Sequence, residues 1–114
     1  MAFSSLLNIA IILFIVTTIM GIYLSSCVFL EKERPRLVIV AHGIFSIIAF
    51  FILVSHYPET IVAILLYIIA MLFGLSLLYQ DLSMIPFTKW FCIAHAVFAV
   101  TSCILLIMYG MKIN

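Results

Sequence analysis

Charged and polar residues divide the chain into four long apolar runs. The runs cover residues of about 6–30, 37–55, 61–79 and 90–109, and each approaches or reaches the roughly 20 residues that a helix needs to span a bilayer. Apolar residues are continuous within each run, which predicts helices and not the alternating strands of a membrane barrel. The three prolines all fall between the runs, where helices are expected to break. The pattern therefore predicts one all-α domain over residues 1–114, a bundle of four transmembrane helices.

The composition supports a membrane protein and excludes several soluble classes. Hydrophobic residues make up 68% of the chain and charged residues only 8%, whereas about a quarter of a soluble domain is charged. Five Lys and Arg against four Asp and Glu leave no basic face for nucleic acid. Three cysteines without a C-x-x-C motif indicate neither a disulfide framework nor a cysteine zinc site. The expected environment is therefore the lipid bilayer.

Basic residues predict the orientation of the spans. Lys32, Arg34 and Arg36 lie between the first and second runs, and Lys89 lies between the third and fourth. Loops rich in Lys and Arg stay on the cytoplasmic side. We therefore expect a multi-pass protein in which both termini face the non-cytoplasmic side.

The two halves of the chain are similar to each other. A shift of 53 residues places His42 on His95, Arg36 on Lys89 and Gly21 on Gly74. The first and third spans run in the same direction, as do the second and fourth, so the repeat axis would lie along the membrane normal. The sequence thus predicts a two-plus-two internal repeat.

Two histidines lie inside predicted spans, where ionisable groups are rare and usually functional. His42 follows Arg36 by six residues and His95 follows Lys89 by six, which places each about 9 Å inside its span. The repeat sets the two imidazoles at the same depth, facing each other. Imidazoles on opposite faces of a flat metal macrocycle would have this symmetry, and imidazole is a common axial ligand of haem iron. We therefore predict a bis-histidine haem site with His42 and His95 as the metal ligands.

Neighbouring residues suit the same interpretation. An aromatic residue follows each histidine by three positions, Phe45 and Phe98, and could line the edge of the macrocycle. The glycines of the other two spans would let a macrocycle approach the backbone. The basic residues at the span ends could reach haem propionates. The predicted cofactor-binding residues are Gly21, Arg36, His42, Phe45, Gly74, Lys89, His95 and Phe98.

A third histidine brings in a known family. His56 follows His42 by fourteen residues, which puts both on one helix face about 21 Å apart. Two histidines so spaced, facing another histidine-bearing helix, resemble the four-helix haem core of the cytochrome b family. There the second and fourth spans each carry two ligands and hold two stacked haems. In this chain the residue fourteen beyond His95 is Tyr109, so the resemblance implies one b-type haem per protomer.

A second haem that involves His56 would require two protomers. No second haem is expected within one protomer, because the fourth ligand is missing. A haem shared between His56 of two protomers stays an alternative, as does a His56 that is simply an interfacial side chain in water.

A bis-histidine iron has no open coordination position, which predicts an electron carrier more than an enzyme that turns over a substrate. Its expected partners are a quinone or a redox protein, and a small bundle of this kind could form a homodimer. Two alternatives from other classes stay open. One is a structural or assembly subunit of a membrane complex whose histidines only form hydrogen bonds between helices. The other is a small four-helix transporter, although residues 6–30 lack the carboxylate that the first span of such transporters carries.

Overall fold

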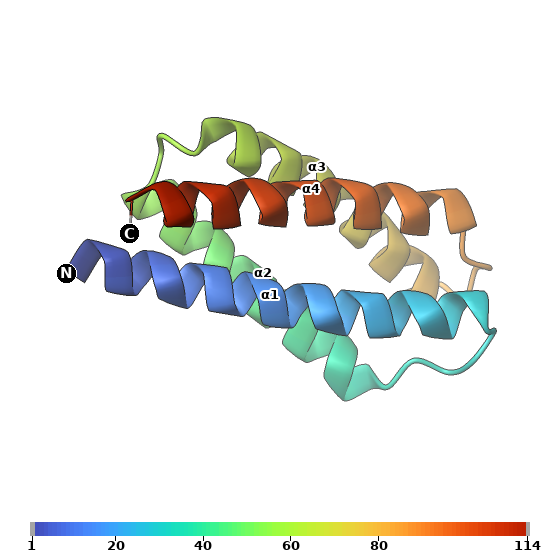
Figure 1. Cartoon of the computed structure of the whole chain (residues 1–114). Helices are drawn as coiled ribbons and strands as arrows, with labels where there is room; N and C mark the ends of the chain where they lie inside the picture. Colours follow the sequence, from blue (N-terminus) through green and yellow to red (C-terminus); the bar gives the residue numbers. More distant parts are fainter. Residues whose placement is uncertain (1, 114) are drawn as a thin grey trace.

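Four helices make up the protein, as the apolar runs predict (Figure 1). The computed structural model describes residues 2–113, which contain helices and no strand. All four helices are long and apolar enough to cross a membrane. The four-helix prediction is therefore confirmed, and the chain is a multi-pass integral membrane protein. The helices are α1 (Ala2–Phe29), α2 (Arg36–His56), α3 (Ile61–Leu82) and α4 (Lys89–Ile113).

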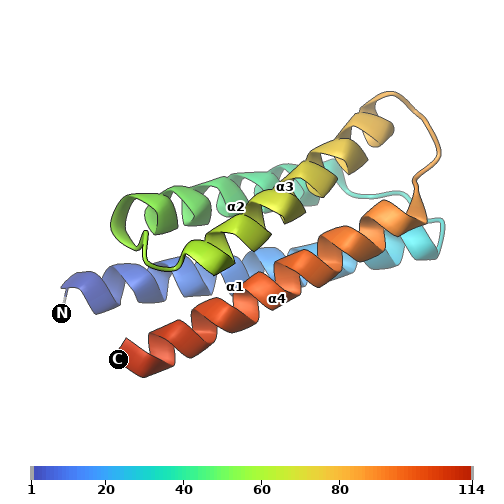
Figure 2. The ribbon, with the colours of Figure 1, turned by 90° about the horizontal axis from the view of Figure 1, so that it is seen from above.

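The helices alternate in direction and form two hairpins. Both termini and the short connection between α2 and α3 lie at one end of the bundle, and the two longer connections lie at the other (Figure 2). The α1 helix packs against α2 and α3 packs against α4, while α1 also packs along α4. Contact between α2 and α3 is much sparser. The bundle is 45 Å long, which is close to the thickness of a bilayer with its headgroups.

The backbone repeats with the predicted shift of 53 residues, even where the side chains differ. Glu31 after α1 and Met84 after α3 both have a positive φ, of 55° and 57°. In each case the next residue donates its N–H to a carbonyl five positions back, from Lys32 to Cys27 and from Ile85 to Gln80. This is the hydrogen-bond pattern of a Schellman motif, which usually has glycine at the left-handed position. The two hairpins thus turn in the same way, which supports the two-plus-two repeat.

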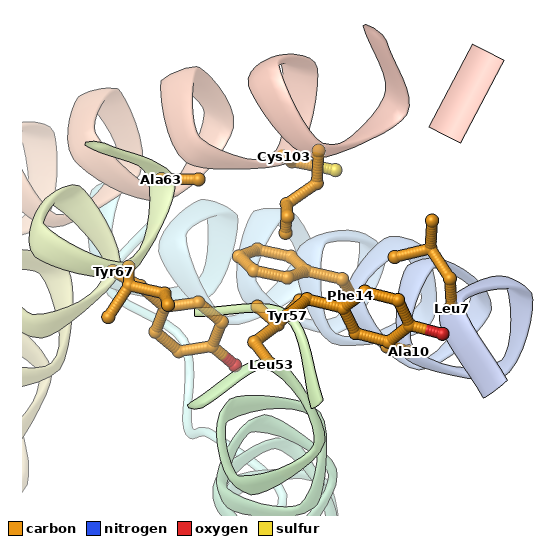
Figure 3. Packing of buried hydrophobic residues seen from close by; sticks show 10 residues of the cluster. Leu7, Ala10, Phe14, Leu53, Tyr57, Ala63, Tyr67 and Cys103 are labelled. Carbon is orange, nitrogen blue, oxygen red and sulfur yellow. The ribbon is translucent and has the colours of Figure 1, made fainter. Parts of the chain in front are cut away.

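The buried core lies in the half of the bundle nearest the termini. The Phe14 and Tyr67 rings meet edge to face there, with their centroids 4.4 Å apart. The buried hydroxyl of Ser102 donates to the Ala63 carbonyl at 2.8 Å, which satisfies a polar group without water. Ten buried residues form this core cluster (Figure 3), namely Leu7, Ala10, Phe14, Leu53, Tyr57, Ala63, Ile64, Tyr67, Cys103 and Leu106.

Polar contacts join the two longer connections at the opposite end. Arg34 forms an ion pair with Asp81, with 2.5 Å between guanidinium nitrogen and carboxylate oxygen. The same guanidinium lies 4.1 Å from the centre of the Phe87 ring. The Gln80 side chain holds Thr88 by two hydrogen bonds, one from the Thr88 amide and one to its hydroxyl. This end of the bundle therefore combines polar side-chain contacts with a few buried residues such as Val28 and Cys92.

We expect the Asp81→Ala substitution to lower the free energy of unfolding by about 1–3 kcal/mol, since a charged hydrogen-bond partner of a partly buried guanidinium is lost. Glu33→Ala, at an exposed position of the first connection, is the matched control and should change stability little. Chemical unfolding in detergent micelles followed by circular dichroism measures both. Equal effects of the two substitutions would contradict a stabilising role for this ion pair.

Candidate functional site

The structure brings the two membrane-embedded histidines together. His42 comes from α2 and His95 from α4, and both side chains are half-buried. The centroids of the two imidazole rings are 6.1 Å apart, and the ring planes are inclined by 71°. Because α2 belongs to one hairpin and α4 to the other, the pair lies at the junction of the two repeats.

Each histidine is held by a backbone carbonyl of the partner helix in its own hairpin. His42 Nδ1 lies 2.9 Å from the Thr17 carbonyl oxygen, and His95 Nδ1 lies 2.6 Å from that of Ala70. A carbonyl oxygen only accepts hydrogen bonds, so Nδ1 must carry the proton in both rings. A neutral imidazole then presents an unprotonated Nε2. Within the part of the chain that the structure describes, no hydrogen bond is recorded at either Nε2.

Two glycines make these contacts sterically feasible. A Cβ atom on Gly21 would lie 3.0 Å from His42 Cε1, and one on Gly74 would lie 3.0 Å from His95 Cε1. In a regular α-helix the carbonyl of residue i faces residue i+4, so a glycine four residues after the carbonyl leaves it uncovered. The sequence predicts that these glycines admit a macrocycle. In the structure, the groups that approach them are the imidazoles themselves.

A cavity of about 460 Å³ surrounds the histidine pair and is bounded by all four helices. Both histidines and both of these glycines line it, and its walls are mostly apolar. All but one of its lining residues form pairs that are 53 positions apart, such as Phe14 with Tyr67. The cavity therefore follows the repeat of the chain. Its volume falls within the range of about 300–1,000 Å³ that is usual for small-molecule sites.

A smaller cavity of about 100 Å³ continues toward the longer connections. It shares both histidines with the larger cavity and extends to Arg34, Asp81 and Phe87. The histidine pair thus lies between an apolar space on one side and a charged pair on the other.

Several residues that the sequence singled out lie elsewhere. Phe45 and Phe98 line neither cavity, and Phe98 instead stacks on Phe73 at a centroid distance of 6.1 Å. Arg36 is exposed and also lines neither cavity. The Lys89 ammonium lies outside both as well, 5.9 Å from the centre of the Phe29 ring. His56, in the last turn of α2, is exposed and far along the helix from His42.

Two residues of the site carried no recognisable signal in the sequence. Arg34 reaches the smaller cavity although its neighbours in the chain do not. Tyr67 lines the larger cavity, and its hydroxyl donates to the Ser46 carbonyl at 2.6 Å while lying 2.9 Å from the Ser46 hydroxyl. The equivalent positions in the other pair of helices are Phe14 and Ala99, which cannot form these bonds.

The donor set is limited to the histidine pair. Among residues 2–113, no group of three or more His, Cys, Asp or Glu side chains gathers as a metal site would require. Comparison of the chain with models of protein families, with curated proteins and with solved structures found no match. The resemblance to the cytochrome b family therefore stays a prediction.

We expect Gly21→Ala to displace the His42 ring, because the overpacking cost of about 1–3 kcal/mol should exceed the helix-propensity gain of up to about 1 kcal/mol and leave the protein less stable. Gly43→Ala is the matched control on α2, because a Cβ there meets nothing within 4 Å. That substitution should stabilise the helix by up to about 1 kcal/mol. Nitrogen chemical shifts of ¹⁵N-labelled histidine report the Nδ1 hydrogen bond, and chemical unfolding reports stability. Equal perturbation of the histidine signals by both substitutions would show that Gly21 has no special role.

Proposed function

We propose that the protein binds one haem b per protomer between His42 and His95 and carries electrons within the membrane. The distance between the two rings supports the proposal most directly. A metal bond to an imidazole nitrogen is about 2.0–2.1 Å long, so imidazoles on opposite sides of one metal have ring centres roughly 6 Å apart. The centroids of His42 and His95 are 6.1 Å apart.

The chemistry of the two rings also suits a metal ligand. Metal-binding histidines usually donate their other ring N–H to a carbonyl or carboxylate, which fixes the tautomer and the ring orientation. The Thr17 and Ala70 carbonyls do this for His42 and His95, leaving Nε2 free to bind. An apolar cavity of about 460 Å³ around the pair is consistent with a large flat cofactor. The residues present therefore fit a haem group.

In this proposal His42 and His95 would hold the haem, and the Thr17 and Ala70 carbonyls keep both rings in position. When bound in this way, haem supplies a one-electron redox centre with no open coordination position. The apolar walls keep water away from the ligand nitrogens. We therefore infer an electron carrier and not an enzyme that acts on a bound substrate.

The partners follow from the depth of the site. The histidines lie on the side of the longer connections, which the distribution of Lys and Arg predicts to be cytoplasmic. Electron transfer across the whole bilayer would then need a second centre near the other face. A mobile quinone, a redox protein, or a haem shared between His56 of two protomers in a homodimer could supply it.

The haem proposal predicts a low-spin b-type absorption spectrum from protein that is produced with ample haem and purified in detergent. His42→Ala and His95→Ala should each abolish that spectrum, because each removes one axial ligand. His56→Ala is the control and should retain it. Oxidised and dithionite-reduced spectra are the measurement. A colourless wild type, or loss of the spectrum in His56→Ala alone, would refute the assignment.

The proposed sidedness predicts that both termini face away from the cytoplasm. Reporter fusions at each terminus, one type active only in the cytoplasm and the other only outside it, test this directly. A cytoplasmic C-terminus would contradict the assignment of Arg34, Arg36 and Lys89 to the cytoplasmic side.

A further inference from the structure

Among the described residues, Arg34 is the basic side chain that lines the smaller cavity beside the histidine pair. We propose that its guanidinium binds an acidic group, a carboxylate, on the ligand held between His42 and His95. This inference rests on the proposed function, because it concerns the same ligand. It differs from the prediction made from the sequence, which assigned this role to Arg36 and Lys89.

The smaller cavity that adjoins the histidine pair extends to Arg34, while Arg36 and Lys89 line neither cavity. A ligand bound at the histidines can therefore extend toward Arg34 through the smaller cavity, which shares both histidines with the larger one. The cavity provides no comparable route to the other basic side chains of the longer connections.

The Arg34 guanidinium has a hydrogen-bond donor that the protein leaves unpaired. One terminal nitrogen of Arg34 bonds to Asp81 at 2.5 Å, but Nε is buried and has no hydrogen-bond partner among the described residues. Buried donors are nearly always paired, so an unpaired one calls for an explanation. Stacking on Phe87, with 4.1 Å to the ring centre, fixes the plane of the group and leaves its edges for hydrogen bonds. A carboxylate that accepts from Nε would complete the set.

Asp81 already balances the charge of Arg34, so an acidic ligand group would bind there through the hydrogen-bonding geometry of the guanidinium and not because a charge is left unpaired. A guanidinium can bind a second anion along another edge. The two propionates of haem b have the required chemistry. A lipid phosphate would have a similar charge, so the experiment must separate a group on the ligand from a lipid headgroup.

The experiment compares haem b with its dimethyl ester, in which both carboxylates are blocked and the iron is unchanged. Each is titrated into the full-length apoprotein in a neutral detergent, and the absorbance of the low-spin complex gives the Kd. We expect the wild type to prefer haem b by about tenfold, as one lost charged hydrogen bond would cause. Arg34→Gln should remove the preference by weakening haem b alone, while Lys32→Gln, at an exposed position, should keep it.

The outcomes separate this inference from the proposed function. If neither compound gives a low-spin complex with the wild type, haem ligation itself is refuted. If both bind with equal affinity, or if Arg36→Gln or Lys89→Gln removes the preference and Arg34→Gln does not, the role of Arg34 is refuted while haem ligation stands. Should Arg34→Gln fail to fold, Arg34→Lys retains the charge but lacks Nε–H, and its preference for haem b should fall.

One further arm tests the lipid alternative. Anionic phosphatidylglycerol added to the micelles should leave the preference of the wild type for haem b unchanged. If it abolishes that preference, Arg34 binds a lipid phosphate and the assignment to a ligand carboxylate is wrong.

Discussion

The structure depends on how two polar rings are accommodated inside an apolar bundle. A buried N–H without an acceptor is costly in a medium that contains no water. His42 and His95 meet this constraint by donating Nδ1–H to a carbonyl of the neighbouring helix. A helical carbonyl already accepts one bond within its own helix and is normally covered by a side chain, so the imidazole needs a place where the backbone is bare. Gly21 and Gly74 provide it, and they thereby fix how closely the two helices of each hairpin pack.

Repetition of this arrangement produces the site. Carbonyl and histidine are 25 residues apart in both hairpins, and the hairpins end in the same left-handed turn at Glu31 and Met84. Each hairpin alone contributes one imidazole with an unprotonated Nε2. Only the junction of the two hairpins brings a pair of them together, so the cavity that surrounds the pair is a property of the repeat and not of either half.

The two halves nevertheless differ in how closely their helices pack beside the cavity. The α1 and α4 helices pack along each other, whereas the equivalent pair, α2 and α3, makes sparse contact. Tyr67 spans this looser side and bonds to Ser46, while Phe14 and Ala99 occupy the equivalent positions on the closer side. A polar link thus takes the place of close packing. This allows the α2–α3 side to leave space beside the histidines without separating completely.

The sequence predicted the parts of this arrangement that depend on spacing along one helix. The apolar runs gave the number of helices because a bilayer sets their length, and flanking charges gave the equal depth of His42 and His95. Contacts that depend on the rotation of a helix about its axis do not follow from such spacing. Phe45 and Phe98, which the sequence predicts at the edge of a macrocycle, therefore line neither cavity. The conformation of the two turns cannot be predicted from the sequence either. Glu31 and Met84 adopt the left-handed conformation at positions where glycine is usual.

The positions of buried polar atoms without hydrogen-bond partners indicate where the protein could bind a ligand. Among the described residues, Thr17 Oγ1 and Arg34 Nε are the buried side-chain polar atoms without a hydrogen-bond partner. Thr17 lines the larger cavity and Arg34 the smaller one. Elsewhere, buried polar groups such as the Ser102 hydroxyl are bonded within the protein. Unmet hydrogen-bonding capacity therefore collects around the histidine pair, as expected for a site at which a bound group supplies the missing partners.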